Sequence, residues 1–243
     1  MRCVIVIPAR MAATRFPGKP LVDLNGKPMI QWVWERAQAA EVADRVIVAT
    51  PDAAIVDACK SFGAEAILTR DDHASGTDRI AEVANIVLAD VYVNVQGDEP
   101  LVHPPTIRAC AETILDNPTH QIGSVMDVCP LDEYDAPSTV KVVVDLDDVA
   151  LYFSRFPIPY ARNHRADAVL KHVGLYAYRR KPLIEFSSWH PTALEVAESL
   201  EQLRFMEHGY RIKMVKGKGS AIAVDEPHHA DAVRLELEQR RKG

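Results

Sequence analysis

The sequence predicts a single α/β domain over residues 1–243, with a mostly parallel central sheet flanked by helices and an antiparallel excursion at 130–180. Three observations point to this fold. Apolar, β-branched runs alternate with amphipathic helical patterns in the first hundred residues, as in a parallel sheet with crossover helices. Strand-like runs in the second half flank a short acidic turn, as in a hairpin. Of the 243 residues, 48% are hydrophobic and 26% charged, which is enough apolar material for one large core.

The first half of the chain alternates between strand and helix patterns. The strand-like runs are Cys3–Ile7, Arg45–Thr50, Ala66–Leu68 and Val91–Val95. Apolar residues recur at helical spacing between them, in residues 29–37, 52–62 and 78–88. Ligands gather outside the carboxyl ends of the strands in open α/β sheets. We therefore expect the loop after Pro8 and the loop around Asp98 to face one site.

The second half changes character. Val140–Asp145 and Val149–Phe153 flank the acidic turn 146–148, and a Pro-containing loop follows at Phe156–Tyr160. Two further strands are expected at Val173–Tyr178 and Ile212–Val215. Two helices are expected, at Leu194–His208, with Val196, Leu200, Leu203 and Met206 facing inward, and at Ala230–Gln239.

Composition and motifs exclude several classes of protein. Lys and Arg total 28 against 34 Asp and Glu, so the net charge is −6, and we expect no nucleic-acid partner. The four cysteines lack a C-x-x-C pair and read as reduced thiols. No apolar run reaches the ~18 residues of a membrane span or resembles a signal peptide, so we expect a cytoplasmic protein without membrane insertion. Neither G-x-G-x-x-G after the first strand nor a P-loop motif occurs, which excludes dinucleotide-dependent and P-loop classes.

A basic loop lies between the first strand and the first helix. The segment PARMAATRFPGKPL contains Arg10, Arg15 and Lys19, with Thr14 offering a hydroxyl. A triphosphate suits these cations, because Arg makes bidentate contacts and Lys supplies a compact charge. A solvated, charged loop is the alternative that the spacing alone leaves open.

Two aspartates are candidate ligands of a divalent cation. A bound triphosphate needs a metal to bridge its oxygens, and Mg²⁺ selects carboxylate oxygens. Asp98 follows a strand in QGDEP, and Asp225 ends an apolar run before a Pro-containing turn in a distant segment. Either aspartate alone also fits a turn or a helix cap. His228 and His229 nearby read as the start of the last helix.

Four blocks, in order along nearly the whole chain, carry a family resemblance. PARMAATRFPGKPL, TRDDHASGTDR, VNVQGDEP and SLEQLR together resemble the 3-deoxy-manno-octulosonate cytidylyltransferase family, which makes the CMP derivative of 3-deoxy-manno-octulosonate (Kdo) for bacterial lipopolysaccharide. Hexose-1-phosphate nucleotidyltransferases have a Gly-Gly before the basic loop, and it is absent here. Pro20 follows Lys19, where CMP-sialic acid synthetases usually have Asn. The resemblance implies a Rossmann-like, glycosyltransferase-A-like nucleotidyltransferase fold. It also implies a homodimer, with 130–180 contributing to the acceptor site and the dimer interface.

The resemblance also implies roles for individual residues. Those for the nucleotide are Arg10, Thr14, Arg15, Lys19, Arg70, Ser75 and Gly76, with Arg10 and Lys19 also catalytic. Asp98 and Asp225 match the family's two catalytic magnesium aspartates. Those for the acceptor are Gln96, Arg155, His172, Tyr176, and Glu201 with Gln202 on the polar side of their helix. Taken alone, Thr77 and Asp78 also fit a helix cap, His172 a structural histidine and Tyr176 a core residue. The family often has V-D-T-P-E-D where this chain has VDEPHH at 224–229, a departure that bears on the local loop geometry and on the choice of acceptor rather than on the metal.

The expected reaction is attack by the anomeric hydroxyl of Kdo on the α-phosphorus of CTP, with pyrophosphate leaving in line and Mg²⁺ held by Asp98 and Asp225. No residue is assigned as a general base. One alternative is a cytidylyltransferase for another acidic acceptor, such as an 8-amino-Kdo analogue, sialic acid or a phosphonate. Another is a non-catalytic nucleotide-binding module, which would need a lost metal ligand or acceptor site, and neither aspartate is missing.

Overall fold

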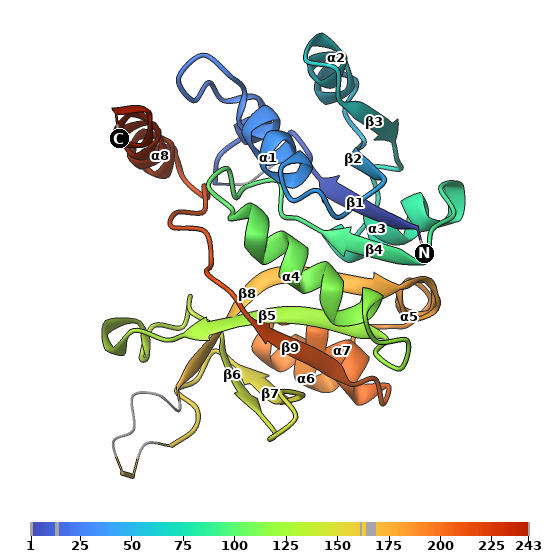
Figure 1. The fold of residues 1–243 in the computed structure, drawn as a ribbon, viewed down its shortest axis with the longest axis vertical. Coiled ribbons are helices and arrows are strands. Elements are labelled where there is room, and N and C mark those ends of the chain that lie inside the picture. Colours follow the sequence, from blue (N-terminus) through green and yellow to red (C-terminus); the bar gives the residue numbers. More distant parts are fainter. Residues whose placement is uncertain (1, 13–14, 161, 164–168, 243) are drawn as a thin grey trace.

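The described residues of the computed structural model, 2–12, 15–160, 162–163 and 169–242, form one nine-stranded mixed sheet with helices on both faces (Figure 1). Its main path runs β3-β2-β1-β4-β8-β5-β9, and β6 and β7 extend from β8. The strands are β1 (Cys3–Pro8), β2 (Arg45–Thr50), β3 (Glu65–Leu68), β4 (Val91–Asn94), β5 (Ile122–Val128), β6 (Lys141–Val144), β7 (Ala150–Ser154), β8 (Leu170–Arg179) and β9 (Ile212–Lys216). The α-helices are α1 (Met29–Gln38), α2 (Ala53–Ser61), α3 (Gly76–Ile86), α4 (Pro104–Leu115), α5 (Arg180–Phe186), α6 (Ala193–Glu198), α7 (Gln202–Glu207) and α8 (Pro227–Lys242).

The N-terminal half is a parallel sheet buried on both faces. β1 pairs in parallel with β2 and β4, and β2 with β3. Because side chains alternate along a strand, Ile5 and Ile7 pack on one face with α1, α2 and α4, whereas Val4 and Val6 pack on the other with α3 and α5. This arrangement confirms the predicted strands and crossover helices, and it brings the ends of β1 and β4 to the same edge of the sheet.

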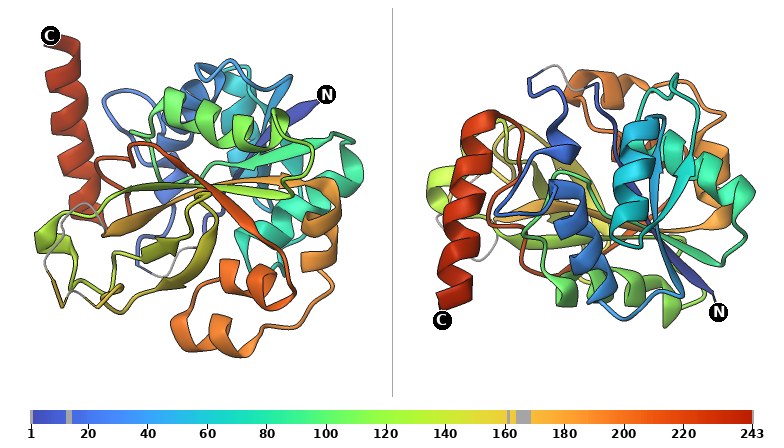
Figure 2. Two further views of the ribbon diagram at one scale, coloured as in Figure 1. Left: turned by 60° about the horizontal axis from the view of Figure 1, so that its bottom comes forward. Right: turned by 90° about the horizontal axis from the view of Figure 1, so that it is seen from above.

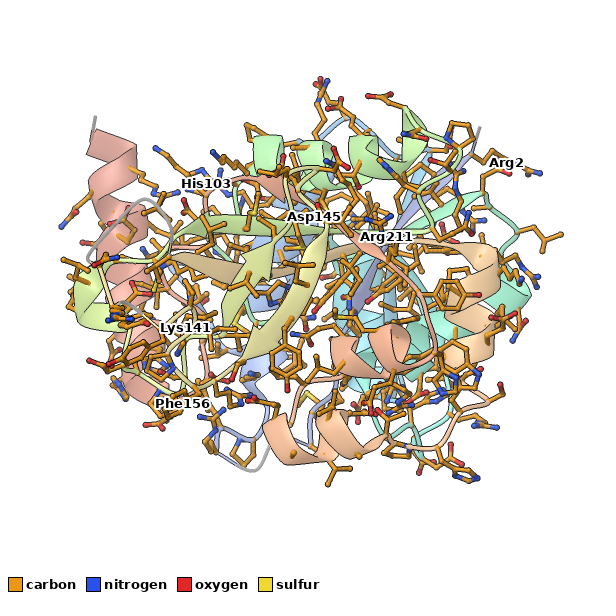
Figure 3. The ribbon with its side chains drawn as sticks, turned by 90° about the horizontal axis from the view of Figure 1, so that it is seen from below. Arg2, His103, Lys141, Asp145, Phe156 and Arg211 are labelled. Carbon is orange, nitrogen blue, oxygen red and sulfur yellow. The ribbon has the colours of Figure 1, made fainter. Side chains whose placement is uncertain are left out.

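The antiparallel excursion predicted for the second half is confirmed. β8 runs antiparallel to both β4 and β5, and β6 and β7 form a hairpin beside it. The base of the hairpin is held by Lys141, a fully buried side chain whose ammonium donates to the carbonyls of Ala136 at 3.0 Å, Thr139 at 2.6 Å and Arg155 at 2.7 Å (Figure 3). A buried ammonium is tolerated when its donors are satisfied in this way.

The helix expected at Leu194–His208 is wrong as a single element. The chain turns at Ser199, whose φ of 52° lies in the left-handed region, and this turn separates α6 from α7. Leu200 and Leu203 are buried as expected, but Val196 is 66% exposed. Three elements, α4, β5 and α5, have no counterpart in the sequence analysis.

Helix α8 lies along one side of the molecule (Figure 2). Its Val233 and Leu237 pack with Leu24 and Met29 in a separate apolar cluster. All four cysteines are buried and free, as expected. Within the described residues, no helix has the length and apolar character needed to span a bilayer.

Candidate active site

A cavity of about 380 Å³ opens where β1 and β4 end. It is lined by Pro8, Ala9, Arg10, Arg15, Phe16, Lys19, Pro20, His73, Ala74, Ser75, Gly76, Arg79, Gln96, Gly97, Asp98 and Asp225. The expectation that the loop after Pro8 and the loop around Asp98 face one site is confirmed. Close approach between them requires glycine at position 97, because a Cβ atom there would lie 2.6 Å from the carbonyl oxygen of Pro8.

The basic loop is folded back on itself before it reaches the cavity. The backbone N–H of Gly18 donates to the carbonyl of Met11 at 2.9 Å, and Gly18 has a φ of +76°, which glycine adopts without strain. The next residue, Lys19, begins a short 3₁₀ helix at Lys19–Leu21. This turn directs the Lys19 ammonium toward the carboxylates. Thr14 lies outside the described residues.

One ammonium joins the two aspartates predicted from distant segments. Lys19 Nζ lies 2.8 Å from Asp98 Oδ2 and 3.5 Å from Asp225 Oδ1, and it donates to the carbonyl of Val224 at 3.0 Å. The Arg15 guanidinium lies 3.1 Å from Asp225 Oδ1. The backbone also links the segments, since the N–H of Val224 donates to the carbonyl of Asp98 at 2.8 Å. Two cations and two carboxylates therefore share one edge of the cavity.

Asp225 is positioned by the helix that follows it. His229 Nδ1 accepts the backbone N–H groups of Asp225 at 3.2 Å and Glu226 at 3.3 Å, which caps the first turn of α8. Further along α8, the Arg234 guanidinium donates to the carbonyl of Asp23 at 3.0 and 2.7 Å, and the amide of Asn25 donates to the Arg234 carbonyl at 2.9 Å. This reciprocal clasp ties α8 to the turn that follows the basic loop.

We expect Arg234→Ala to loosen Asp225 relative to Lys19. The substitution removes both guanidinium bonds of the clasp, at a cost of about 1–2 kcal/mol. We predict a melting temperature lower by a few degrees and a several-fold loss of activity, measured by calorimetry and a nucleotide-transfer assay. The matched control is Arg240→Ala on the same helix, where the guanidinium pairs with Glu236 at 2.8 Å. Equal effects of the two substitutions would contradict the clasp.

The segment before α3 supplies the small residues of the cavity. Ser75 is the N-cap of α3, where its Oγ accepts the N–H of Asp78 at 3.2 Å. The cap is therefore Ser75 and neither Thr77 nor Asp78. Ser75 and Gly76 line the cavity as predicted. Arg70 does not line it, because its exposed guanidinium pairs with Asp72 at 3.1 Å.

Of the predicted acceptor residues, Gln96 follows β4 and lines the cavity, whereas His172 and Tyr176 lie on β8 and do not line it. The Gln96 amide donates to the carbonyl of Gly174 at 3.5 Å. Ser124 donates its hydroxyl to a β8 carbonyl and therefore accepts from His172 Nε2 at 2.9 Å, which leaves Nδ1 as an acceptor. Burial lowers the pKa of His172 to about 3, so its ring is neutral near pH 7. Tyr176 packs against this ring with 5.2 Å between ring centroids.

Glu201 and Gln202 depart from the expected polar helix face. Glu201 precedes α7 and accepts the hydroxyl of Thr77 at 2.8 Å, one residue beyond Gly76 of the cavity. Burial raises the pKa of the Glu201 carboxyl. Gln202 is buried, and its side-chain nitrogen has no hydrogen-bond partner among the described residues. The expectation that both lie on the polar side of one helix is wrong, because the chain turns at Ser199, Glu201 precedes α7 and Gln202 is buried.

Arg155 lies away from the cavity. Its guanidinium donates to the carbonyls of Glu198 at 2.8 Å, Pro137 at 2.9 Å and Ser199 at 3.3 Å. These bonds join the β6–β7 hairpin to the end of α6. Arg155 therefore holds the antiparallel excursion against the end of α6, and it does not line the cavity.

Two ionisable residues of the cavity lining, His73 and Arg79, were missed by the sequence analysis although both stand in the block TRDDHASGTDR. His73 Nε2 contacts Glu82 Oε2, and Arg79 donates to Thr69 Oγ1 and to the carbonyl of Arg70. Both residues stand close to the predicted nucleotide residues Ser75 and Gly76, and this position could have identified them.

The donor set fits a magnesium ion that also binds substrate. Asp98 and Asp225 are partly exposed carboxylates at one edge of the cavity, with side chains 31% and 39% exposed. Within the described ranges, no group of three or more His, Cys, Asp or Glu side chains is arranged to hold a metal. One or two carboxylates completed by phosphate oxygens and water is the coordination that Mg²⁺ favours.

Next to Asp98, Glu99 has a buried Oε2 atom without a partner. Burial, together with the charge of Asp98, raises the pKa of Glu99 to about 7.

An α/β sheet with a basic loop after β1, facing two carboxylates across one cavity, is the arrangement expected of a nucleotidyltransferase. The cytidylyltransferase family matches residues 4–213. A 3-deoxy-manno-octulosonate cytidylyltransferase of Geobacter sulfurreducens is 45% identical, covering 98% of this chain and all of that protein. One from Escherichia coli is 47% identical, covering 98% of this chain and 97% of that protein.

Among solved structures, CMP:2-keto-3-deoxy-manno-octonic acid synthetase complexed with CTP matches with a TM-score of 0.96 and 45% identity, covering 99% of this chain and 100% of that one. The chain belongs to the 3-deoxy-manno-octulosonate cytidylyltransferase family and is an enzyme of the cytidylyltransferase class.

Proposed function

We propose that the protein transfers CMP from CTP to the anomeric hydroxyl of Kdo and releases pyrophosphate, which supplies CMP-Kdo for lipopolysaccharide synthesis. The observation that carries this proposal is the convergence of Arg15 and Lys19 with Asp98 and Asp225 at one edge of the cavity. Relatives that are 3-deoxy-manno-octulosonate cytidylyltransferases, and a similar structure in complex with CTP, support it.

The side chains of the cavity suit this reaction. Arg10, Arg15 and Lys19 bind the triphosphate and compensate the charge that develops on the departing pyrophosphate. Asp98 and Asp225 would hold Mg²⁺. When bound, the ion would polarise the phosphate oxygens and favour ionisation of the acceptor hydroxyl. No side chain is assigned as a general base.

The acceptor would lie between the cavity and β8. Gln96, Glu201 and the neutral His172 offer donors and acceptors to the hydroxyl groups of a sugar acid, and Tyr176 and Gln202 close the same region. We do not assign Arg155 to the acceptor site, because its guanidinium donates to three backbone carbonyls away from the cavity.

The 130–180 excursion also presents an exposed apolar surface for a second copy of the chain. Phe156 is 74% exposed and Tyr160 is 88% exposed, and Figure 3 shows Phe156 near the margin of the molecule. We propose that this surface forms a homodimer interface, and light scattering should give the mass of a dimer. The four free, buried thiols support a reducing cytoplasmic setting.

The function is tested with radiolabelled CTP, Mg²⁺ and a panel of acceptors. We expect labelled CMP-Kdo with Kdo and little product with sialic acid, an 8-amino-Kdo analogue or a phosphonate. Transfer confined to one of those other acids would replace Kdo as the substrate. CTP binding without transfer to any acceptor would favour a non-catalytic module.

Arg15→Ala should mainly weaken capture of the nucleotide. The Arg15 side chain is 62% exposed and adds charge at the rim of the cavity, so we predict a KM for CTP raised about tenfold with kcat within a few-fold of wild type. The control is Arg45→Ala, which breaks a surface pair with Glu65 between β2 and β3. An unchanged KM for CTP in Arg15→Ala would refute this assignment.

A further inference from the structure

Arg79 is a buried cation in the wall of the cavity. It lies in the second turn of α3 and is only 3% exposed. Its NH1 group donates to Thr69 Oγ1 and, at 2.8 Å, to the carbonyl of Arg70. Among the described residues, its Nε and NH2 groups have no hydrogen-bond partner.

The charge of Arg79 has no direct counter-ion in the protein. Within the described part of the chain, no carboxylate lies within ion-pair distance of its guanidinium. Burial lowers the pKa of Arg79, and the neighbouring positive charge of Arg10 lowers it further, yet a guanidinium stays protonated in proteins. A buried charge is costly unless it is paired.

The other cations of the cavity differ in this respect. Arg15 and Lys19 are already paired with Asp98 and Asp225. Arg10 resembles Arg79, because it lines the cavity and forms no ion pair with any described residue. The cavity thus has one edge where each cation is paired with a carboxylate and a second where the guanidinium groups of Arg10 and Arg79 line the cavity without an ion pair among the described residues. The carboxylates of Glu82, Asp52 and Asp71 act on Arg79 only from beyond ion-pair distance.

We propose that Arg79 is a phosphate-binding residue, which with Arg10 forms a cation pair whose counter-ion is the polyphosphate of the nucleotide. This inference rests on the proposed function for the identity of that nucleotide as CTP. The same guanidinium anchors Thr69 and Arg70 at the nucleotide segment, so one side chain links phosphate binding to the position of that segment.

The test compares Arg79→Gln with wild type by calorimetry, using inorganic tripolyphosphate, CTP and cytidine as separate probes. We expect affinity for tripolyphosphate and CTP to fall at least about tenfold, the effect of losing a charge-assisted contact, with a clearly smaller loss for cytidine, which feels only the loosened segment. Equal losses for CTP and cytidine, or unchanged affinity for tripolyphosphate, would show a structural anchor only and overturn the proposal.

A matched control and a conservative variant complete the test. Arg180→Gln removes a guanidinium that donates to the Ala84 carbonyl at 3.2 Å and to Asn85 Oδ1 at 3.3 Å, at the opposite end of α3, and should leave tripolyphosphate binding unchanged. If Arg79→Gln does not fold, Arg79→Lys decides the matter, because it keeps the charge. Affinity for tripolyphosphate within about threefold of wild type supports the proposal, and a tenfold loss overturns it.

The inference and the proposed function can fail separately. A wild-type protein that binds tripolyphosphate through Arg79 but transfers no CMP to Kdo would refute the function and support the role of Arg79. Normal CMP transfer to Kdo by Arg79→Gln, with an unchanged KM for CTP, would support the function and refute the role of Arg79.

Discussion

Replacing Asp98 with Asn should abolish CMP transfer while the protein stays folded. The substitution keeps a side-chain oxygen that can accept from Lys19 but removes the negative charge that a divalent cation selects. We expect the rate to fall about a hundredfold or more, as when a group that stabilises charge in the transition state is lost. Stability should change little, because the Asp98 side chain is 31% exposed and exposed ion pairs contribute little.

The matched control for this prediction is Asp57→Asn. Asp57 also pairs with a lysine, Lys60 at 3.0 Å, but on the surface of α2 and outside the cavity. It should retain full activity. Wild-type turnover by Asp98→Asn would show that Asp98 holds no essential metal.

Lys19→Met should have a comparable effect for a different reason. The Lys19 side chain is only 16% exposed and contacts both Asp98 and Asp225. Without its ammonium, Asp98 loses its cation and Asp225 keeps only Arg15, and one charge that stabilises the leaving pyrophosphate is lost. We predict kcat/KM for CTP about a hundredfold lower or more, with kcat affected as well as KM, measured by steady-state kinetics.

Lys60→Met provides the corresponding control, because it removes the lysine of the Asp57–Lys60 pair on α2. Its kinetics should match wild type. If Lys19→Met also retained wild-type kcat/KM, the basic loop would have no part in the reaction.

The parts of the fold that the sequence predicted are those set by local pattern. A continuous apolar run such as Cys3–Ile7 is typical of a strand that is buried on both faces of a sheet. The structure places β1 at Cys3–Pro8. Helix α4 begins with Pro104 and Pro105, which also suit a loop. In β5, the strand pattern is interrupted by Gly123, where a Cβ atom would lie 1.9 Å from Thr113 Oγ1. The need for glycine at this position comes from α4, which packs on the strand, and cannot be recognised from the strand sequence alone.

The residues of the candidate site also fall into those that the sequence could predict and those that depend on packing between distant segments. Arg15, Lys19, Asp98 and Asp225 could be predicted, because their residue types suit a phosphate and metal site and the family resemblance favoured that site over a solvated loop and turn aspartates. The engagement of Arg155 with three carbonyls could not, since its partners come from α6 and from the loop before β6. The burial of Arg79 likewise depends on how α3 packs against the sheet.

The central claim is that the basic loop and the two aspartates act on one nucleotide. A crystal structure with CTP and Mn²⁺ in place of Mg²⁺ tests it directly, because the manganese ion is located by its anomalous scattering. The result predicted here is a triphosphate beside Arg10, Arg15 and Lys19 and a manganese peak in contact with both Asp98 and Asp225. A nucleotide bound elsewhere, or a metal in contact with neither aspartate, would contradict the account.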